Sequence, residues 1–116
     1  MGTNYYHRTN ICECCNRYDE KHIGKSSAGW QFSFQGYVND IPRIESFEDW
    51  KRELLTEGKI FDEYSREISF ENFVKLVEGK QSQSKNHYDY CKKEGYNMDN
   101  DWKDKEGYSF TKAEFS

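Results

Sequence analysis

The chain has few of the residues that separate domains or fill a large aliphatic core. It contains one proline in 116 residues, and no proline-rich or glycine/serine-rich linker interrupts it, so we expect a single domain over residues 1–116. Hydrophobic residues make up only 34% of the sequence and aromatic residues alone 17%. A core built from a few large rings is thin, and a small domain with a thin core commonly needs a disulfide or a metal to fold.

The sequence also lacks targeting segments. No apolar run is long enough to cross a bilayer, and the first residues do not combine a charged region with the apolar stretch of a secretory signal. We therefore expect no membrane association and a cytoplasmic location, where thiols stay reduced. In that setting the four cysteines are interpreted as metal ligands rather than as two disulfides.

An excess of positive charge is absent as well. The formal net charge is −4, which argues against a dedicated duplex-DNA binder, because such proteins gain affinity by neutralising phosphates. A basic protein partner is at least as compatible with this charge. Pairs such as Cys14 with His22, or Ser26 with His22, do not by themselves define a nucleophilic site. We therefore expect a protein without catalytic residues.

The clearest chemistry lies in the spacing of cysteines and histidines. Cys12 and Cys15 form a Cys-x-x-Cys pair that can present two thiolates inside one turn, and zinc needs four nitrogen or sulfur ligands. His87 and Cys91 are spaced to share one helix face and can complete the set, with His22 as the alternate ligand. Weaker candidates are His7 and Cys14. Four protein ligands leave no place for water, so the expected zinc is structural.

A second candidate site is the glycine–lysine–serine run at residues 24–27. It resembles the end of a phosphate-binding loop, but Asp19 stands where that motif requires glycine. We interpret the run as a turn between two strands whose amides can still form a small anion nest. The residues assigned here to binding are Lys25, Ser26, Ser27 and Trp30.

Hydrophobic periodicity predicts an α+β fold. Strands are expected at residues 4–11, 30–37 and 107–111, and a short strand or hairpin at 59–68. Helices are expected at 46–57 and 69–78, capped by Ser46 and Ser69 and ended by Gly58 and Gly79. Residues 79–86 and 99–106 are interpreted as polar loops.

These elements predict a small antiparallel sheet, two short helices packed on it, and a zinc-knuckle-like N-terminal hairpin. We expect the knuckle and sheet in residues 1–38, the helices with a short strand in 46–78, and a polar loop with the closing strand in 79–116. The zinc is expected to fix the N-terminal hairpin to the segment around Cys91.

Several stretches resemble small uncharacterised proteins encoded by tailed bacteriophages. They are residues 1–6, 12–15, 22–30, 62–64 and 106–110, of which MGTNYY and HIGKSSAGW are the most specific. The resemblance implies a protein of the host cytoplasm that binds, and in that way inhibits, a bacterial host or defence protein. The alternative is a zinc-knuckle module that binds nucleic acid through Arg8, Arg17, Lys21 and Lys25.

Overall fold

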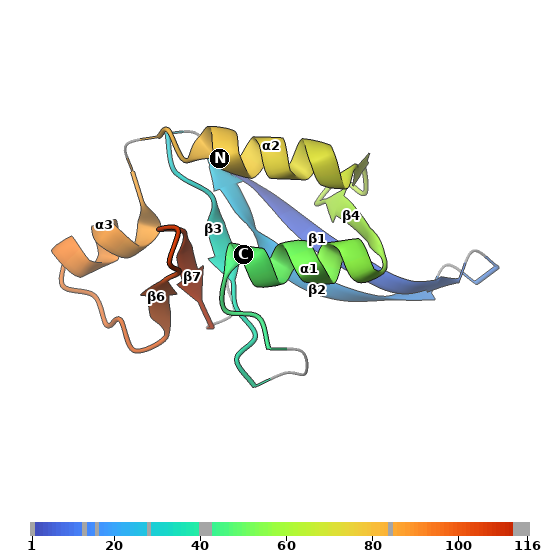
Figure 1. The fold of residues 1–116 in the computed structure, drawn as a ribbon, viewed down its shortest axis with the longest axis horizontal. Coiled ribbons are helices and arrows are strands. Elements are labelled where there is room, and N and C mark those ends of the chain that lie inside the picture. Colours follow the sequence, from blue (N-terminus) through green and yellow to red (C-terminus); the bar gives the residue numbers. More distant parts are fainter. Residues whose placement is uncertain are drawn as a thin grey trace.

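The strands of this protein form one mixed sheet in the order β5-β4-β1-β2-β3-β7-β6 (Figure 1). The structure is a computed structural model that describes residues 2–12, 14–15, 17–27, 29–39, 43–83 and 85–112. The strands are β1 Gly2–Cys12, β2 Arg17–Ser27, β3 Ser33–Gln35, β4 Lys59–Asp62, β5 Glu67–Ile68, β6 Asp101–Lys103 and β7 Ser109–Thr111. The helices are α1 Phe47–Thr56, α2 Phe70–Lys80 and α3 His87–Lys93. The α+β prediction is confirmed.

The fold differs from the prediction in two details, one in the sheet and one in the helices. The sheet is not purely antiparallel, because β3 and β7 pair in parallel, with Phe34 opposite Phe110. A third helix, α3, occupies the segment that contains His87 and Cys91. None of the described helices combines the length and apolar character that crossing a bilayer would require.

The longest element is the hairpin of β1 and β2, which projects from the body of the molecule (Figure 1). Strand β4 pairs with β1 only over residues 5–8, and β3 pairs with β2 only at residues 24–25. Beyond these points, residues 9–12 and 17–19 pair only with each other among the described residues. We call this part the hairpin arm. It carries the Cys-x-x-Cys turn at its end.

Helices α1 and α2 begin where their serine caps were predicted. The backbone N–H of Asp49 donates to Ser46 Oγ at 3.1 Å, and the N–H of Asn72 donates to Ser69 Oγ at 3.2 Å. Such bonds satisfy amides that have no partner inside the helix. Helix α1 ends before Gly58, whose φ is +82°, as predicted. The predicted stop at Gly79 is wrong, because α2 continues through it to Lys80.

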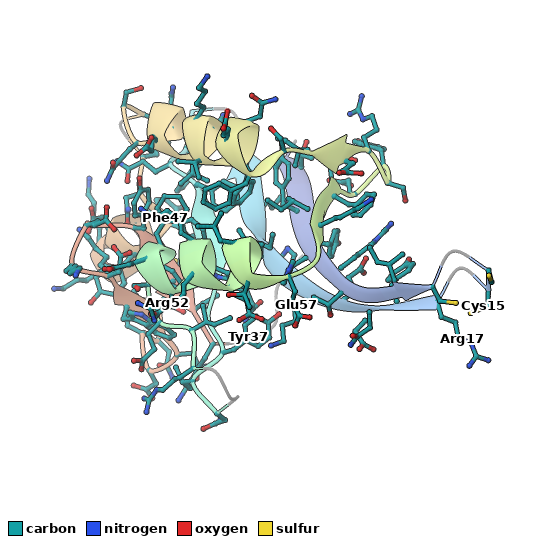
Figure 2. All side chains as sticks on the ribbon, turned by 45° about the vertical axis from the view of Figure 1, so that its right-hand side comes forward. Cys15, Arg17, Tyr37, Phe47, Arg52 and Glu57 are labelled. Carbon is teal, nitrogen blue, oxygen red and sulfur yellow. The ribbon has the colours of Figure 1, made fainter. Side chains whose placement is uncertain are left out.

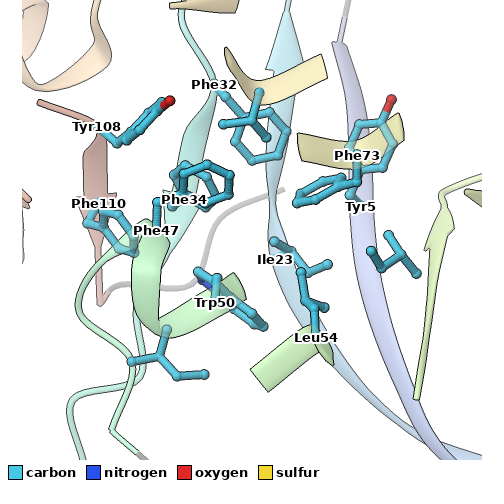
Figure 3. Packing of buried hydrophobic residues seen from close by; sticks show 13 residues of the cluster. Tyr5, Ile23, Phe32, Phe34, Phe47, Trp50, Leu54, Phe73, Tyr108 and Phe110 are labelled. Atoms are coloured by element: carbon cyan, nitrogen blue, oxygen red, sulfur yellow. The ribbon is translucent and has the colours of Figure 1, made fainter. Parts of the chain in front are cut away.

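The core between the two helices and the sheet is aromatic, as the composition predicts (Figure 3). Eight of the thirteen residues in its buried cluster are aromatic. The rings of Phe34 and Phe110 stack at 4.9 Å between centroids, and Phe73 of α2 meets Phe32 edge-on at 5.6 Å. Because each ring buries a large apolar area, a few residues supply most of the hydrophobic stabilisation.

Other predicted elements are displaced. The strand expected at 30–37 is regular only at Ser33–Gln35, and Trp30 makes an isolated bridge to Lys85 instead. The polar loop expected at 99–106 contains β6. The turn expected at residues 24–27 is also wrong, because these residues belong to β2. A side chain at Gly24 would clash with the Ser33 carbonyl and the Phe32 ring, so this glycine permits close strand packing.

Candidate metal centre

Helix α3 is held against the sheet by Asn86, its N-cap residue. Asn86 Oδ1 accepts from the N–H of Asp89 at 3.1 Å. Its amide nitrogen donates to Gln31 Oε1 at 3.0 Å and to the Gly107 carbonyl at 3.2 Å. Lys103 Nζ of β6 forms an ion pair with Asp89 Oδ1 at 2.9 Å. The buried Asn86 thus fixes the start of α3 and the ion pair ties the helix to β6.

Three potential metal ligands meet where α3 faces β6. His87, Cys91 and Asp101 each offer one ligand atom, and these atoms all lie within 4.8 Å of one another. The Cys91 Sγ atom is 3.8 Å from His87 Nε2 and 3.9 Å from Nδ1. For a tetrahedral zinc site with ordinary Zn–S and Zn–N bonds, the sulfur and nitrogen would be about 3.6 Å apart. The three donors are therefore of types that zinc accepts, and the Cys91–His87 spacing is close to that of a zinc site.

The electrostatic environment of Cys91 depends on whether a cation is present. Burial, and then the charge of Asp101, raise the pKa of its thiol. A bound divalent cation would reverse this effect, because a coordinating thiol is deprotonated by the metal. Three protein donors also leave one tetrahedral position for water or another ligand. The group therefore differs from the closed four-ligand site expected from the spacing.

A cavity of about 290 Å³ lies beside this group. Its lining includes the cross-strand neighbours Lys25, Ser33 and Ser109, and Trp30 and His87 line it as well. Its full lining is Lys25, Ser27, Trp30, Ser33, Phe34, His87, Ser109 and Thr111. Of the residues assigned to binding from the sequence, the structure thus brings Lys25, Ser27 and Trp30 together, while Ser26 is not part of the lining.

The other half of the expected zinc site lies elsewhere. Cys12 and Cys15 sit at the end of the hairpin arm (Figure 2), whereas α3 lies at the opposite end of a molecule whose longest axis spans 49 Å. The structure therefore does not bring these two thiols together with His87 and Cys91. The expected zinc bridge between the N-terminal hairpin and the Cys91 segment is not formed, because β1 and β2 curve together away from the body and hold the cysteine turn at the far end.

The two thiols of the arm do contact each other. The pKa of the Cys12 thiol is lowered by hydrogen bonds from the Cys15 thiol and from the backbone N–H groups of Cys15 and Cys14. All three cysteines of the turn are exposed, and none of the four cysteines in the chain forms a disulfide. The predicted pairing of Cys12 with Cys15 in one turn therefore describes their contact correctly.

The remaining histidines have structural contacts. His22 Nε2 lies 2.9 Å from Asn4 Oδ1 across β1 and β2, so the alternate ligand is not near the arm cysteines or α3. His7 is buried, and its Nε2 lies 2.7 Å from the Glu57 carbonyl, which accepts a hydrogen bond from the ring.

Among the cations proposed to bind nucleic acid, Arg8 forms an ion pair with Glu20 at 2.8 Å.

Asp101 is the ligand that the sequence interpretation missed. It lies in an acidic stretch that has no ligand spacing, and only the pairing of β6 with β7 places it opposite α3.

No family model, curated protein or solved structure matches this chain. The site is therefore interpreted from its own geometry.

Proposed function

We propose that this protein is a zinc-stabilised, non-enzymatic binding protein of the host cytoplasm, and that it binds and inhibits a bacterial host or defence protein. The observation that carries the proposal is the aromatic pair Trp30 and Tyr90 beside the cavity and the metal-ligand group, which we call the aromatic rim. Trp30 is half-buried and lines the cavity, and it meets Tyr90, which is 44% exposed, edge-on at 5.3 Å. Tyrosine and tryptophan in such positions are typical of residues that dominate binding energy in protein interfaces.

Zinc would supply the rigidity of this rim. Helix α3 spans only His87–Lys93 and buries none of its residues fully, and a helix this short is marginal without tertiary support. Bonds from one zinc to His87, Cys91 and Asp101 would fix α3 to β6. Tyr90 lies between the two helical ligands in sequence, so the same bonds would hold its ring against Trp30. The metal is assigned a structural role, with water in the remaining coordination position.

The cavity would receive one anchoring side chain of the partner. Lys25, Ser33 and Ser109 are among its lining residues, and an ammonium group and two hydroxyl groups suit a polar or acidic group at the end of that side chain. The rest of this acidic chain, with a net charge of −4, favours a partner with basic residues around that anchor. Both features support a protein partner over duplex nucleic acid.

Affinity capture from a bacterial lysate, with nuclease added, tests this function. The bait is compared with Tyr90→Ala and with Tyr96→Ala, a matched control because Tyr96 is 60% exposed but, unlike Tyr90, makes no ring contact with Trp30. We expect one host protein whose affinity, measured afterwards with purified components, falls at least tenfold for Tyr90→Ala and not for Tyr96→Ala. Recovery of nucleic acid alone, with strong salt dependence, would support the zinc-knuckle alternative instead.

A further inference from the structure

The hairpin arm ends in an incomplete metal site. Cys12 and Cys15 are both exposed, Cys15 lies at the end of the arm (Figure 2), and the Cys15 thiol is near enough to lower the pKa of the Cys12 thiol. They come from one turn, with Cys12 as the last residue of β1. Two thiolates in this arrangement supply half of the tetrahedral sulfur set that zinc accepts in Cys₄ sites.

The described part of this chain offers nothing to complete the set. Among these residues, the only group of three or more metal-binding side chains is His87, Cys91 and Asp101, at the other end of the molecule. Cys14 belongs to the same turn, but Cys12, Cys14 and Cys15 do not form a group of three thiols close enough to share one metal ion. The two missing donors must therefore come from outside the described residues or from another molecule.

The shape of the arm favours a second copy of the same chain. Residues 9–12 and 17–19 extend past the strands that flank the hairpin at its base, so two arms can meet end to end without contact between the two bodies. A two-fold axis through one metal ion would then present the same cysteine pair from each side. We propose that two copies of this protein are joined by one zinc ion bound to Cys12 and Cys15 of each copy.

Side chains next to the turn are compatible with this joint. Ile11 is 39% exposed and Tyr18 43% exposed, one on each strand of the arm. Both would lose water contact if two arms met, which adds apolar burial to the metal bonds. The arm residues 9–12 and 17–19 contain one positive side chain, Arg17, and one negative side chain, Asp19, which accepts from the Asn10 amide, so two arms do not oppose each other as surfaces of one charge.

Light scattering during size-exclusion chromatography tests the proposal on the full chain, with a non-thiol reductant present throughout. We add one and a half equivalents of zinc per chain. One equivalent serves the α3 group, and half an equivalent serves the arm because one zinc ion would join two arms. The expected mass is twice the 13.9 kDa of the monomer, and a chelator should return it to 13.9 kDa. With cobalt in place of zinc, the dimer should gain a tetrathiolate absorption spectrum.

Matched variants separate this joint from the α3 group. Cys12→Ser and Cys15→Ser should each remain monomeric with zinc, whereas Cys14→Ser, in the same turn, should still double its mass. Cys91→Ser should also dimerise, and its dimer tests the arm independently of the proposed function. A wild-type monomer in zinc, a dimer that survives the chelator, or a dimer of Cys12→Ser would each overturn the proposal. A dimer that forms only when the reductant is left out would overturn it in favour of a disulfide.

Discussion

Replacing Asn86 by alanine should destabilise the protein more than removing an ordinary helix cap. The change removes the bond to the Asp89 N–H, and loss of such a cap costs about 1 kcal/mol. It also deprives Gln31 Oε1 and the Gly107 carbonyl of a donor, and both of these residues are half-buried. A buried acceptor without a partner costs about 1–3 kcal/mol, and a half-buried acceptor, which water can reach, costs no more than the low end of that range. We therefore expect Asn86→Ala to lower the free energy of unfolding by about 2 kcal/mol.

Ser69→Ala is the matched control, because Ser69 caps α2 with one bond and is exposed. It should cost only about 1 kcal/mol. Both variants are unfolded with urea in the presence of a chelator, so that metal binding does not contribute to the difference. If Asn86→Ala loses no more stability than Ser69→Ala, the reasoning that Asn86 anchors α3 to the sheet is wrong.

Three further results are expected. Burial tends to raise the pKa of Asp62, but hydrogen bonds from the Arg66 and Tyr64 backbone N–H groups and the Arg66 guanidinium lower it overall. The ionised Asp62 carboxylate should therefore contribute to stability above the unfolded pKa of about 3.9, and this contribution should be lost as pH falls through the lower folded pKa. The urea midpoint of Asp62→Asn should accordingly depend less on pH in this acidic range than the midpoint of the wild type. An equal pH dependence of the two midpoints would contradict the role of Asp62. Gly24→Ala should destabilise the protein by about 1–3 kcal/mol, the usual cost of overpacking, because the added Cβ meets the β3 backbone. Gly79→Ala lies in open space within α2 and should stabilise the protein by up to about 1 kcal/mol. Urea unfolding of the two variants checks the sign of each change. His22→Ala should leave the zinc content measured by metal analysis unchanged, because His22 contacts Asn4 and not the α3 group, and a loss of zinc would restore it as a ligand.

The elements that could be predicted from the sequence are those set by local interactions. Helices α1 and α2 follow from a serine cap and an apolar stripe within a few residues, and both starts agree with the structure. The β4–β5 pair agrees with the expectation of a short strand or hairpin at residues 59–68. The helix end predicted at Gly79 was wrong. Glycine is common at helix ends, but here Val77 is buried in the core and α2 continues through Gly79 to Lys80.

The candidate site depended on contacts that no local pattern records. The spacing of His87 and Cys91 correctly indicated that they share a helix, and that of Cys12 and Cys15 that they share a turn. Whether two such pairs meet depends on the path of the chain between them, and the long β1–β2 hairpin separates them. Asp101 reaches α3 only because β6 pairs with β7, a contact without a sequence signature.

The same limit explains the glycine–lysine–serine run. Its letters resemble a phosphate-binding loop, but Gly24 is needed where β2 and β3 approach closely. Lys25 and Ser27 follow on β2 and reach the cavity because residues two apart on a strand share a face. Of the residues assigned to binding, Lys25 and Ser27 thus meet through strand geometry rather than through a loop.

Zinc-edge X-ray absorption of the Cys12→Ser/Cys15→Ser double variant, loaded with one equivalent of zinc and dialysed, tests the metal centre most directly. The variant leaves Cys91 as the sulfur donor of the only described group of three ligands. The account predicts retained zinc with one sulfur at about 2.3 Å and the remaining nitrogen or oxygen ligands at about 2.0–2.2 Å. Complete loss of zinc on dialysis, or a coordination shell without sulfur, would contradict it.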